Sequence, residues 1–593
     1  MDRRTLVQLI TVLAAARPAV SQDRSGRSAA PPQAGRAAAP QAGRGQQAPM
    51  RVTKEEITGA LKLMGLEFTD AEIDMMLRPV NTALGSYESL RKVEIGYGVE
   101  PAFHFQPGLP NRAAIKGPQR FDTTIPKVGA AKAPANLEDA AFWPVTQLAP
   151  LIRSRAVSST DLTKMYIDRM QRYSPKLLCL ITLTEDLALE RAGDADKEIR
   201  QGKYKGPLHG IPFGVKDLFD TKGIRTTWGA EPFQDRIPDE DATCVDRLHK
   251  AGAVLIAKLS MGALAQGDLW FNGRTRNPWN TESGSSGSSA GSASATSAGL
   301  VGFALGTETL GSIVSPSTVC GTVGLRPTYG RVSRHGAMAL SWTMDKIGPI
   351  CRGVEDCALV LNAIYGPDGH DRSVGADPFH WEPRKPLKSL KVAVMQSMFD
   401  RAGAGRGGGG GGGGRGADPN AAAEMKAMYA QALDDIRKAG VTMTPVEYEE
   451  GGLSMRFLLE AEGAAAFDDI TRDGEVRTLK GQAAGDWPNT FRTSRLIPAV
   501  EYIRAQRART QVVEKFERFM AEWDVVVIPT NSLLTTTNLT GNPQVVMKCG
   551  FTGGLPRSIS FLGKIYDEGS PLRVAMAYEQ VTEWHKKNPT LTA

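Results

Sequence analysis

The sequence has few of the residues that build disulfide frameworks or metal sites. Its 593 residues include six cysteines and seven histidines, with no C-x-x-C pair and no H-x-x-x-H pair. A disulfide framework needs a short chain dense in cysteine, and a zinc site needs ligands clustered at short spacings. We therefore expect neither, and we expect no bound metal and no cofactor.

Long apolar runs are also missing from the sequence. No stretch reaches the roughly 18 uninterrupted apolar residues typical of a bilayer-spanning helix, so we expect no integral membrane domain in the mature form. The composition, 41% hydrophobic and 23% charged, is typical of a globular protein. It excludes collagen, a coiled coil and a chain that is disordered throughout.

An excess of one charge is confined to the N-terminus. The whole chain carries +7, and residues 1–50 hold seven arginines against two aspartates, which accounts for +5 of that charge. The rest of the chain is close to neutral. It lacks the basic surface that a nucleic-acid-binding protein needs, so we expect no nucleic-acid partner.

Residues 1–22 have the pattern of an export signal peptide. Arg3 and Arg4 precede an apolar stretch that ends in a small-x-small site at Ala19-Val20-Ser21. The paired arginines also fit a twin-arginine signal. We expect a periplasmic or secreted protein, or a cytoplasmic one if these residues form an ordinary amphipathic helix. Residues 23–50, rich in Ala, Pro, Gln and Gly, are predicted to be a disordered linker.

Residues 51–135 are predicted to form a small helical module followed by a Pro-rich connector. Thr53 and Glu56 make a capping box ahead of apolar residues at helical spacing, and a second helix is expected from Thr69 to about Leu90. The module either dimerises the chain or covers a pocket of the region that follows it, and the residues leave both roles open. A homodimer is therefore one expectation.

Residues 136–593 alternate between helix-like and strand-like segments. Residues 254–260, 391–397 and 525–530 read as buried strands, and residues 154–173 read as a helix capped at Ser159 or Thr160. The alternation predicts an α/β fold with a mostly parallel or mixed sheet. Residues 401–416 contain eight consecutive glycines, which have no preorganised shape, so we expect a flexible insertion rather than a phosphate-binding loop.

Three segments contain residues suited to chemistry. Lys216 ends an apolar run, where burial would lower its pKa and make it a base, although a surface lysine paired with Asp217 fits equally well. Residues 283–300 consist almost entirely of Ser, Gly and Ala. They form either a flexible linker or a tight turn next to the core. Gly311-Ser312-Ile313 lies in a turn whose N–H groups can form an oxyanion hole.

Together these segments resemble the amidase signature family. The motifs are Gly210-Ile211-Pro212-Phe213-Gly214-Val215-Lys216-Asp217, Gly287-Ser288-Ser289-Ala290-Gly291-Ser292 and Gly306-Thr307-Glu308-Thr309-Leu310-Gly311-Ser312-Ile313. Supporting blocks lie at 320–333, 344–358 and 538–551, so the resemblance covers roughly 140–585. It implies a large mixed central β-sheet flanked by helices, to which this chain adds the small N-terminal helical module.

The resemblance implies a Ser–Ser–Lys triad that cleaves a carboxamide of a small molecule through an acyl-enzyme. Ser312 would be the nucleophile and Lys216 the base, and Ser288, after a cis peptide bond, would relay the proton. Ser288 and Ser312 have the separation of the family's paired serine and nucleophile. The oxyanion would be held by the backbone N–H groups of Thr309, Leu310, Gly311 and Ser312.

Four positions depart from the family pattern. Glu308 replaces an aspartate, Leu310 and Ala290 each replace a glycine, and Val314 replaces an arginine. The triad survives these changes, but the support of the nucleophile loop is altered. We interpret the chain as a divergent, bacterial-type member whose substrate preference is its own. The substrate-binding residues stay unknown, with Thr226, Trp228, Trp342 and Met344 as candidates that fit core packing equally well.

Three alternative readings remain open. Gly287-Ser288-Ser289-Ala290-Gly291 also matches G-x-S-x-G, which would make Ser289 the nucleophile and require a base such as His335 or His370. The same motifs occur in the A subunit of tRNA-dependent amidotransferases, which works with partner subunits. An inactive binding protein on the amidase scaffold is the third reading.

Overall fold

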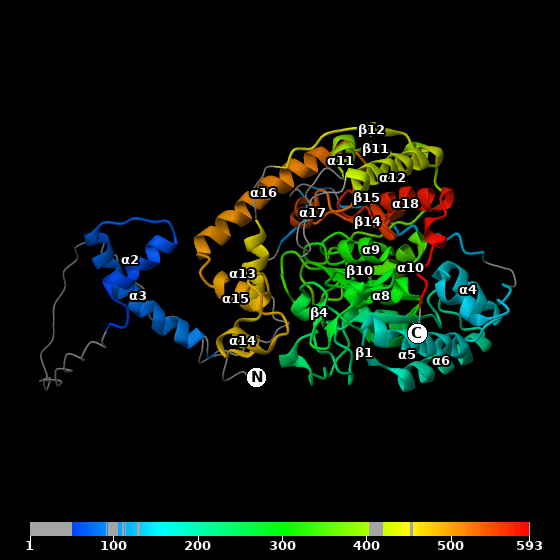
Figure 1. Cartoon of the computed structure of the whole chain (residues 1–593), viewed down its shortest axis with the longest axis horizontal. Coiled ribbons are helices and arrows are strands. Elements are labelled where there is room, and N and C mark those ends of the chain that lie inside the picture. The colour runs from blue at the N-terminus through cyan, green and yellow to red at the C-terminus, as the bar shows by residue number, and fades with distance from the viewer. Residues whose placement is uncertain are drawn as a thin grey trace, which may run out of the picture. The chain divides into compact units, whose positions relative to one another are not determined.

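The computed structural model describes residues 50–90, 92, 105–108, 112, 114–126, 131–402, 419–450 and 455–591 (Figure 1). The predicted signal peptide, the linker apart from Met50, and residues 403–416 of the glycine-rich insertion lie outside this part of the chain. Export and the flexible insertion therefore stay predictions. The chain divides into two compact units, residues 1–93 and residues 94–593.

The first unit contains the helices α2 (Lys54–Leu63) and α3 (Asp70–Leu90). The predicted capping box is present: Thr53 Oγ1 accepts from the N–H of Glu56, and the Glu56 carboxylate accepts from the N–H of Thr53. Ile57, Leu61 and Ile73 are the buried apolar residues at the centre of this helical pair. The described part of this unit therefore has a very small core.

The second unit is built on a mixed sheet of eleven strands in the order β1-β3-β2-β8-β10-β9-β14-β15-β13-β11-β12. β2 runs parallel to β3 and β8, whereas β8, β10, β9, β14, β15 and β13 pair antiparallel. The predicted α/β fold with a large mixed central sheet is confirmed. The strands are β1 Leu180–Leu183, β2 Pro212–Lys216, β3 Val254–Leu259, β8 Phe303–Glu308, β9 Val323–Arg326, β10 Lys346–Cys351, β11 Val392–Val394, β12 Met443–Pro445, β13 Val525–Pro529, β14 Gln544–Thr552 and β15 Leu555–Gly563.

Helices flank this sheet (Figure 1). α6 packs on β3, α8 on β8, α10 on β10, and α12 and α18 on β14. No helix in the described part of the chain is long and apolar enough to cross a bilayer. The main helices are α4 Val145–Ser154, α5 Ser159–Leu177, α6 Glu185–Arg200, α7 Thr243–Lys250, α8 Ala290–Ser297, α9 Val314–Cys320, α10 Val354–Ile364, α11 Gln396–Arg401, α12 Pro419–Lys438, α13 Arg456–Ala466, α14 Asp468–Arg472, α15 Trp487–Ser494, α16 Ala499–Ala521, α17 Leu534–Thr540 and α18 Gly569–Val581.

Two local predictions need correction. The cap of α5 is Ser158, whose side chain accepts from the N–H of Asp161, rather than Ser159 or Thr160. Ser159 is instead the first helical residue, and its N–H donates to Asp196. The strand predicted over 391–397 is confined to Val392–Val394, because helix α11 begins at Gln396.

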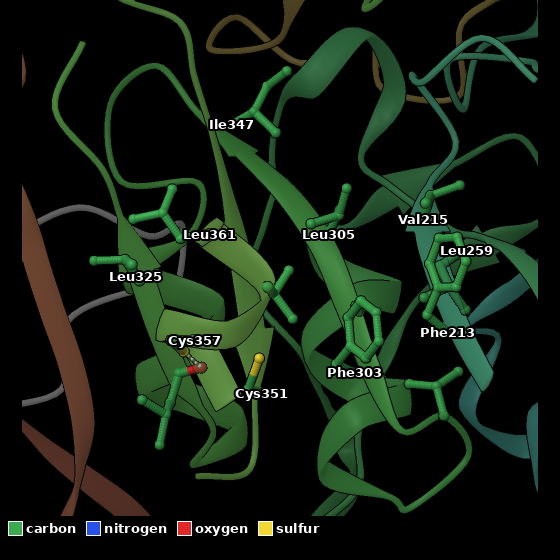
Figure 2. Close-up of a cluster of buried hydrophobic side chains, with 14 of the residues drawn as sticks. Phe213, Val215, Leu259, Phe303, Leu305, Leu325, Ile347, Cys351, Cys357 and Leu361 are labelled. Carbon is green, nitrogen blue, oxygen red and sulfur yellow. Dashed lines mark hydrogen bonds between the residues drawn. The ribbon is translucent and has the colours of Figure 1, made fainter. Parts of the chain in front are cut away.

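The core beneath β2 fixes the strand that carries Lys216 (Figure 2). Phe213 stacks on Phe303 of β8 with ring centroids 5.3 Å apart and an interplanar angle of 7°. Val215 and Leu259 lie in the same buried cluster. Each fully buried side chain of this size stabilises the fold by about 1.5–3 kcal/mol, so β2 is held rigidly.

Candidate active site

Lys216 is fully buried at the end of β2. Its Nζ donates to Ser288 Oγ at 2.7 Å and to Thr307 Oγ1 at 2.8 Å. Burial lowers the pKa of Lys216 to about 7, although the charges of Asp345 and Glu308 partly oppose this effect. A neutral amine within hydrogen-bonding distance of a hydroxyl can accept its proton.

The alternative pairing of Lys216 with Asp217 is wrong. The Asp217 carboxylate lies 3.4 Å from Nζ of Lys258, and both side chains are fully buried. Consecutive strand residues point to opposite faces of a sheet. Lys216 therefore faces hydroxyl groups, and Asp217 lies with Lys258.

Thr307 meets Lys216 because of the strand register. β2 and β8 pair in parallel with Val215 opposite Leu305, so Lys216 lies beside the following residues of β8. The motif places Thr307 there, one residue before Glu308. Thr307 was not identified from the sequence. The signal that could have identified it is that Lys216 and Thr307 lie near the same ends of two strands that pair in parallel.

Ser288 follows a cis peptide bond from Gly287 and is almost fully buried just before helix α8. A side chain at position 287 would collide with the carbonyl oxygen of Gly267, which an added Cβ would approach to 1.8 Å. Glycine is therefore required where this turn passes Gly267. The turn presents the Ser288 hydroxyl to the Lys216 amine.

Ser289 has a different environment from its neighbour. Its Oγ donates to the carbonyl of Thr307 and accepts from the Thr307 N–H, both at 3.1 Å. Its own N–H donates to the carbonyl of Ser312 at 3.2 Å, which links the serine-rich turn to the loop that carries Ser312. These backbone partners give the hydroxyl a structural role, and His335 and His370 stack on each other instead. The alternative in which Ser289 of the G-x-S-x-G motif is the nucleophile needs a histidine base, and no histidine among the described residues hydrogen-bonds to Ser289.

Ser312 lies in the loop between β8 and α9 and is 9% exposed. Gly311 before it has φ 95°, in the left-handed region that favours glycine, whereas Leu310 has no such backbone conformation. Leucine is therefore tolerated at 310. No hydrogen bond within the described residues is donated by the backbone N–H of Thr309, Leu310, Gly311 or Ser312. These predicted oxyanion donors are available to a substrate oxygen.

Glu308 supports this loop despite replacing the family's aspartate. Its carboxylate accepts from the N–H groups of Ile313 and Val314 at 2.9 Å each, immediately after Ser312. Arg326 donates to the same carboxylate at 2.7 Å from within the core. Burial alone would raise the pKa of Glu308, but the Arg326 guanidinium holds it below its usual value. Arg326 thus supplies a cation to the loop in a chain that has valine at position 314.

Ser312 lines a cavity of about 1280 Å³ together with Gly287, Thr309 and Leu310. Helices α13, α15, α16 and α17 contribute many of its other wall residues, most of them apolar, and residues of the segment 263–269 line a further side. Charged side chains also line it: Asp268, Arg274, Glu450, Arg456, Asp486 and Lys515. The cavity exceeds the roughly 300–1,000 Å³ of most small-molecule sites. None of these apolar wall residues was identified from the sequence; they include Leu340, Met455, Leu459, Leu479, Trp487, Val512, Leu533, Leu534 and Leu539.

A second cavity of about 390 Å³ is lined by Thr307 and Thr309 and also by Trp228 and Trp342. These two tryptophans, named as candidates, thus share a cavity with Thr307, the hydroxyl partner of Lys216. The other two candidates do not line either cavity. Thr226 accepts a hydrogen bond from Lys258, and Met344 is buried, so both are packing residues.

Comparisons with known proteins agree with the motifs and the fold. The amidase family model matches residues 161–405. The A subunit of the glutamyl-tRNA(Gln) amidotransferase from Geobacillus thermodenitrificans is 34% identical over 496 residues, which cover 75% of this chain and 99% of that protein. Its counterpart from Heliobacterium modesticaldum is 32% identical and is covered to 98%.

Solved structures show the same fold. An amidase family protein from Bacillus anthracis superposes with a TM-score of 0.67 at 26% identity, covering 77% of this chain and 94% of that one. The peptide amidase from Stenotrophomonas maltophilia superposes with a TM-score of 0.63 at 28% identity, covering 75% and 97%. The described residues contain no group of three or more His, Cys, Asp or Glu side chains that could hold a metal ion. The fold, the motifs and these similarities together establish that the chain belongs to the amidase signature family.

Proposed function

We propose that this protein hydrolyses a carboxamide C–N bond through an acyl-enzyme on Ser312. The observation that carries the proposal is the 2.7 Å hydrogen bond between Lys216 Nζ and Ser288 Oγ, made by a buried lysine whose pKa is lowered to about 7. A base with a pKa near the working pH is the one best suited to proton transfer.

In the proposed reaction Ser312 Oγ attacks the amide carbonyl carbon and loses its proton to Ser288, which passes its own to Lys216. The C–N bond then breaks as the protonated Lys216 returns a proton to the leaving nitrogen. Ammonia or an amine departs. Water then attacks the acyl ester on Ser312, and Lys216 again acts as the base that accepts the proton. The N–H groups around Ser312 stabilise the oxyanion, and the loss of one such donor costs about 3–4 kcal/mol.

The large cavity favours a substrate with an extended apolar group. Its volume of about 1280 Å³ and its leucine-rich wall match a peptide amide or an aryl amide better than a small polar amide. The similarity to a peptide amidase supports this choice.

A second candidate function is that of the ammonia-releasing component of an amidotransferase. It is favoured by the relatives with that name, which align over almost their whole length at 32–34% identity and so support this reading more directly than a stand-alone hydrolase. The bond cleaved is the same, but the ammonia would pass to an acceptor held by a partner protein.

Ammonia release by the full chain tests both functions. The panel is an apolar peptide amide, an aryl amide and glutamine, with Ser312→Ala as the inactive control. Turnover of the apolar amides supports the hydrolase, and turnover of glutamine alone supports the amidotransferase function. A folded wild-type chain that releases nothing from any amide contradicts the hydrolase and favours the binding protein.

A further inference from the structure

An exposed apolar stripe lies at the start of α16, within the second unit. Leu496, Val500 and Ile503 are 65%, 72% and 60% exposed. Val500 and Ile503 are three residues apart on the helix and so share one face. Among the described residues of this unit, five large hydrophobic side chains are exposed, and three of them are in this stripe. A cluster of this kind marks an interaction site more often than a scattered residue does.

Arginines border the stripe. Residues 492–507 contain four arginines and one acidic residue, a net charge of +3. Arg504 and Arg507 follow Val500 and Ile503 by one helical turn and are exposed. Arginine is enriched in protein interfaces. The exposed residues of this segment include no aromatic ring to stack on bases or to anchor at a bilayer surface. This surface, residues 492–507, therefore favours a protein partner.

The turn between α2 and α3 has the complementary character. Residues 62–75 contain one lysine and four acidic residues, a net charge of −3. Leu63, Leu66, Phe68 and Met75 are 76%, 46%, 46% and 71% exposed there. The helical pair has a very small core, and a unit of this size gains stability when its apolar tip is covered.

We infer that this protein self-associates, with the acidic, apolar turn at residues 62–75 of one copy docked on the basic, apolar surface at residues 492–507 of a second copy. The two segments carry opposite net charges around apolar centres. Lys54 pairs with Asp70 and Asp74 of the turn, and Asp468 pairs with Arg495 of the surface. Glu67, Arg504 and Arg507 are among the charged residues of the two segments that have no salt bridge within the described residues. Gln511, four residues or about 6 Å beyond Arg507 along α16, lines the large cavity. The docked turn of the second copy therefore lies near the cavity wall.

Sedimentation velocity of the full chain over a range of concentrations tests this inference. We expect a dimer for the wild type. The variant Arg504→Glu/Arg507→Glu and the variant Glu67→Lys/Asp70→Lys should each have a dissociation constant raised about 100-fold, since like charges then face each other. Mixing the two variants should restore the dimer. Of its two reciprocal contacts, one then joins a wild-type turn to a wild-type surface, and the other joins a turn and a surface whose charges are both reversed. Arg200→Glu/Lys203→Glu, on an exposed surface at the end of α6, is the matched control.

Unchanged melting temperatures will show that each variant is folded. A wild-type chain that stays monomeric at every concentration overturns the inference. So does a mixture of folded variants that remains monomeric, or a control variant that dissociates as strongly. Co-sedimentation of a monomeric wild type with phosphatidylcholine–phosphatidylserine vesicles would assign the surface to a membrane and equally overturn it.

Discussion

Lys216 and Lys258 are both fully buried on neighbouring strands, yet their surroundings differ. β2 and β3 pair in parallel with Val215 opposite Lys258 and Lys216 opposite Leu259. Paired residues share a face and successive residues alternate, so the two lysines project from opposite faces of the sheet. Lys258 meets a carboxylate at 3.4 Å, whereas Lys216 donates to two hydroxyls.

Burial lowers the pKa of both lysines, so what separates them is the chemistry of their partners. Asp217 favours the charged form of Lys258, whose Nζ also donates to the Phe219 carbonyl at 2.6 Å and to Thr226 Oγ1 at 2.5 Å. Such a lysine is held in one geometry. Hydroxyl partners leave Lys216 free to exist as a neutral amine and to exchange a proton with Ser288.

The largest expected effect separates the two lysines by activity. We expect Lys216→Met to lower kcat/KM by up to about 10⁴-fold, because the general base is lost. The melting temperature should hold, since a buried amine is replaced by an apolar side chain of similar length. Lys258→Met is the control and should keep its turnover per folded molecule. Equal losses of kcat/KM in Lys216→Met and Lys258→Met would contradict the assignment of Lys216 alone as the base.

The second prediction concerns stability. Lys258→Met leaves the Asp217 carboxylate buried without its cation, which should lower the free energy of unfolding by about 3–5 kcal/mol. Urea denaturation measures this loss. Adding Asp217→Asn removes the unpaired charge and should recover most of the stability. If Lys258→Met is as stable as the wild type, the Lys258–Asp217 pair does not stabilise the fold.

The motifs allowed much of the site to be predicted, because Lys216, Ser288 and Ser312 lie in short segments of distinctive composition. The fold brings together Lys216 and Ser288, which are 72 positions apart in the chain. The sequence left two partners open for Lys216. The fold separates it from Asp217, which follows the end of β2 and pairs with Lys258.

Contacts between distant segments could not be predicted. Arg326 neutralises Glu308 from another strand, and Asn538 of α17 donates to the same carboxylate at 2.9 Å. The cavity wall combines α13, α15, α16 and α17, and its leucines follow the spacing of ordinary amphipathic helices. Nothing local distinguishes a wall residue such as Leu459 from a core residue.

The third prediction uses pH. With the pKa of Lys216 at about 7, kcat/KM should fall about tenfold per pH unit below that value, because the protonated amine cannot act as a base. Between pH 7 and 10.5 the unfolded chain binds a proton that folded Lys216 does not, so its contribution to stability should rise with pH. A rate profile that is flat down to pH 5 would contradict the neutral-base assignment.

The smallest expected effect distinguishes the adjacent serines. Ser289→Ala leaves the N–H and carbonyl of Thr307 without their partner, which should lower stability by about 1–3 kcal/mol. Its kcat/KM should stay within about tenfold of wild type, whereas Ser288→Ala should lose at least about 100-fold with the proton relay. Ammonia release and urea denaturation give both quantities. The reverse order of activities would assign the relay to Ser289.

The most direct test of the Ser–Ser–Lys assignment is covalent labelling with a fluorophosphonate, followed by mass spectrometry of the peptides. The hydroxyl that is activated as a nucleophile displaces fluoride and retains the phosphonyl group. We predict a label on Ser312 in the wild type and in Lys258→Met, and a strongly reduced label in Lys216→Met. A label on Ser289, or one on Ser312 that persists undiminished in Lys216→Met, would contradict the account.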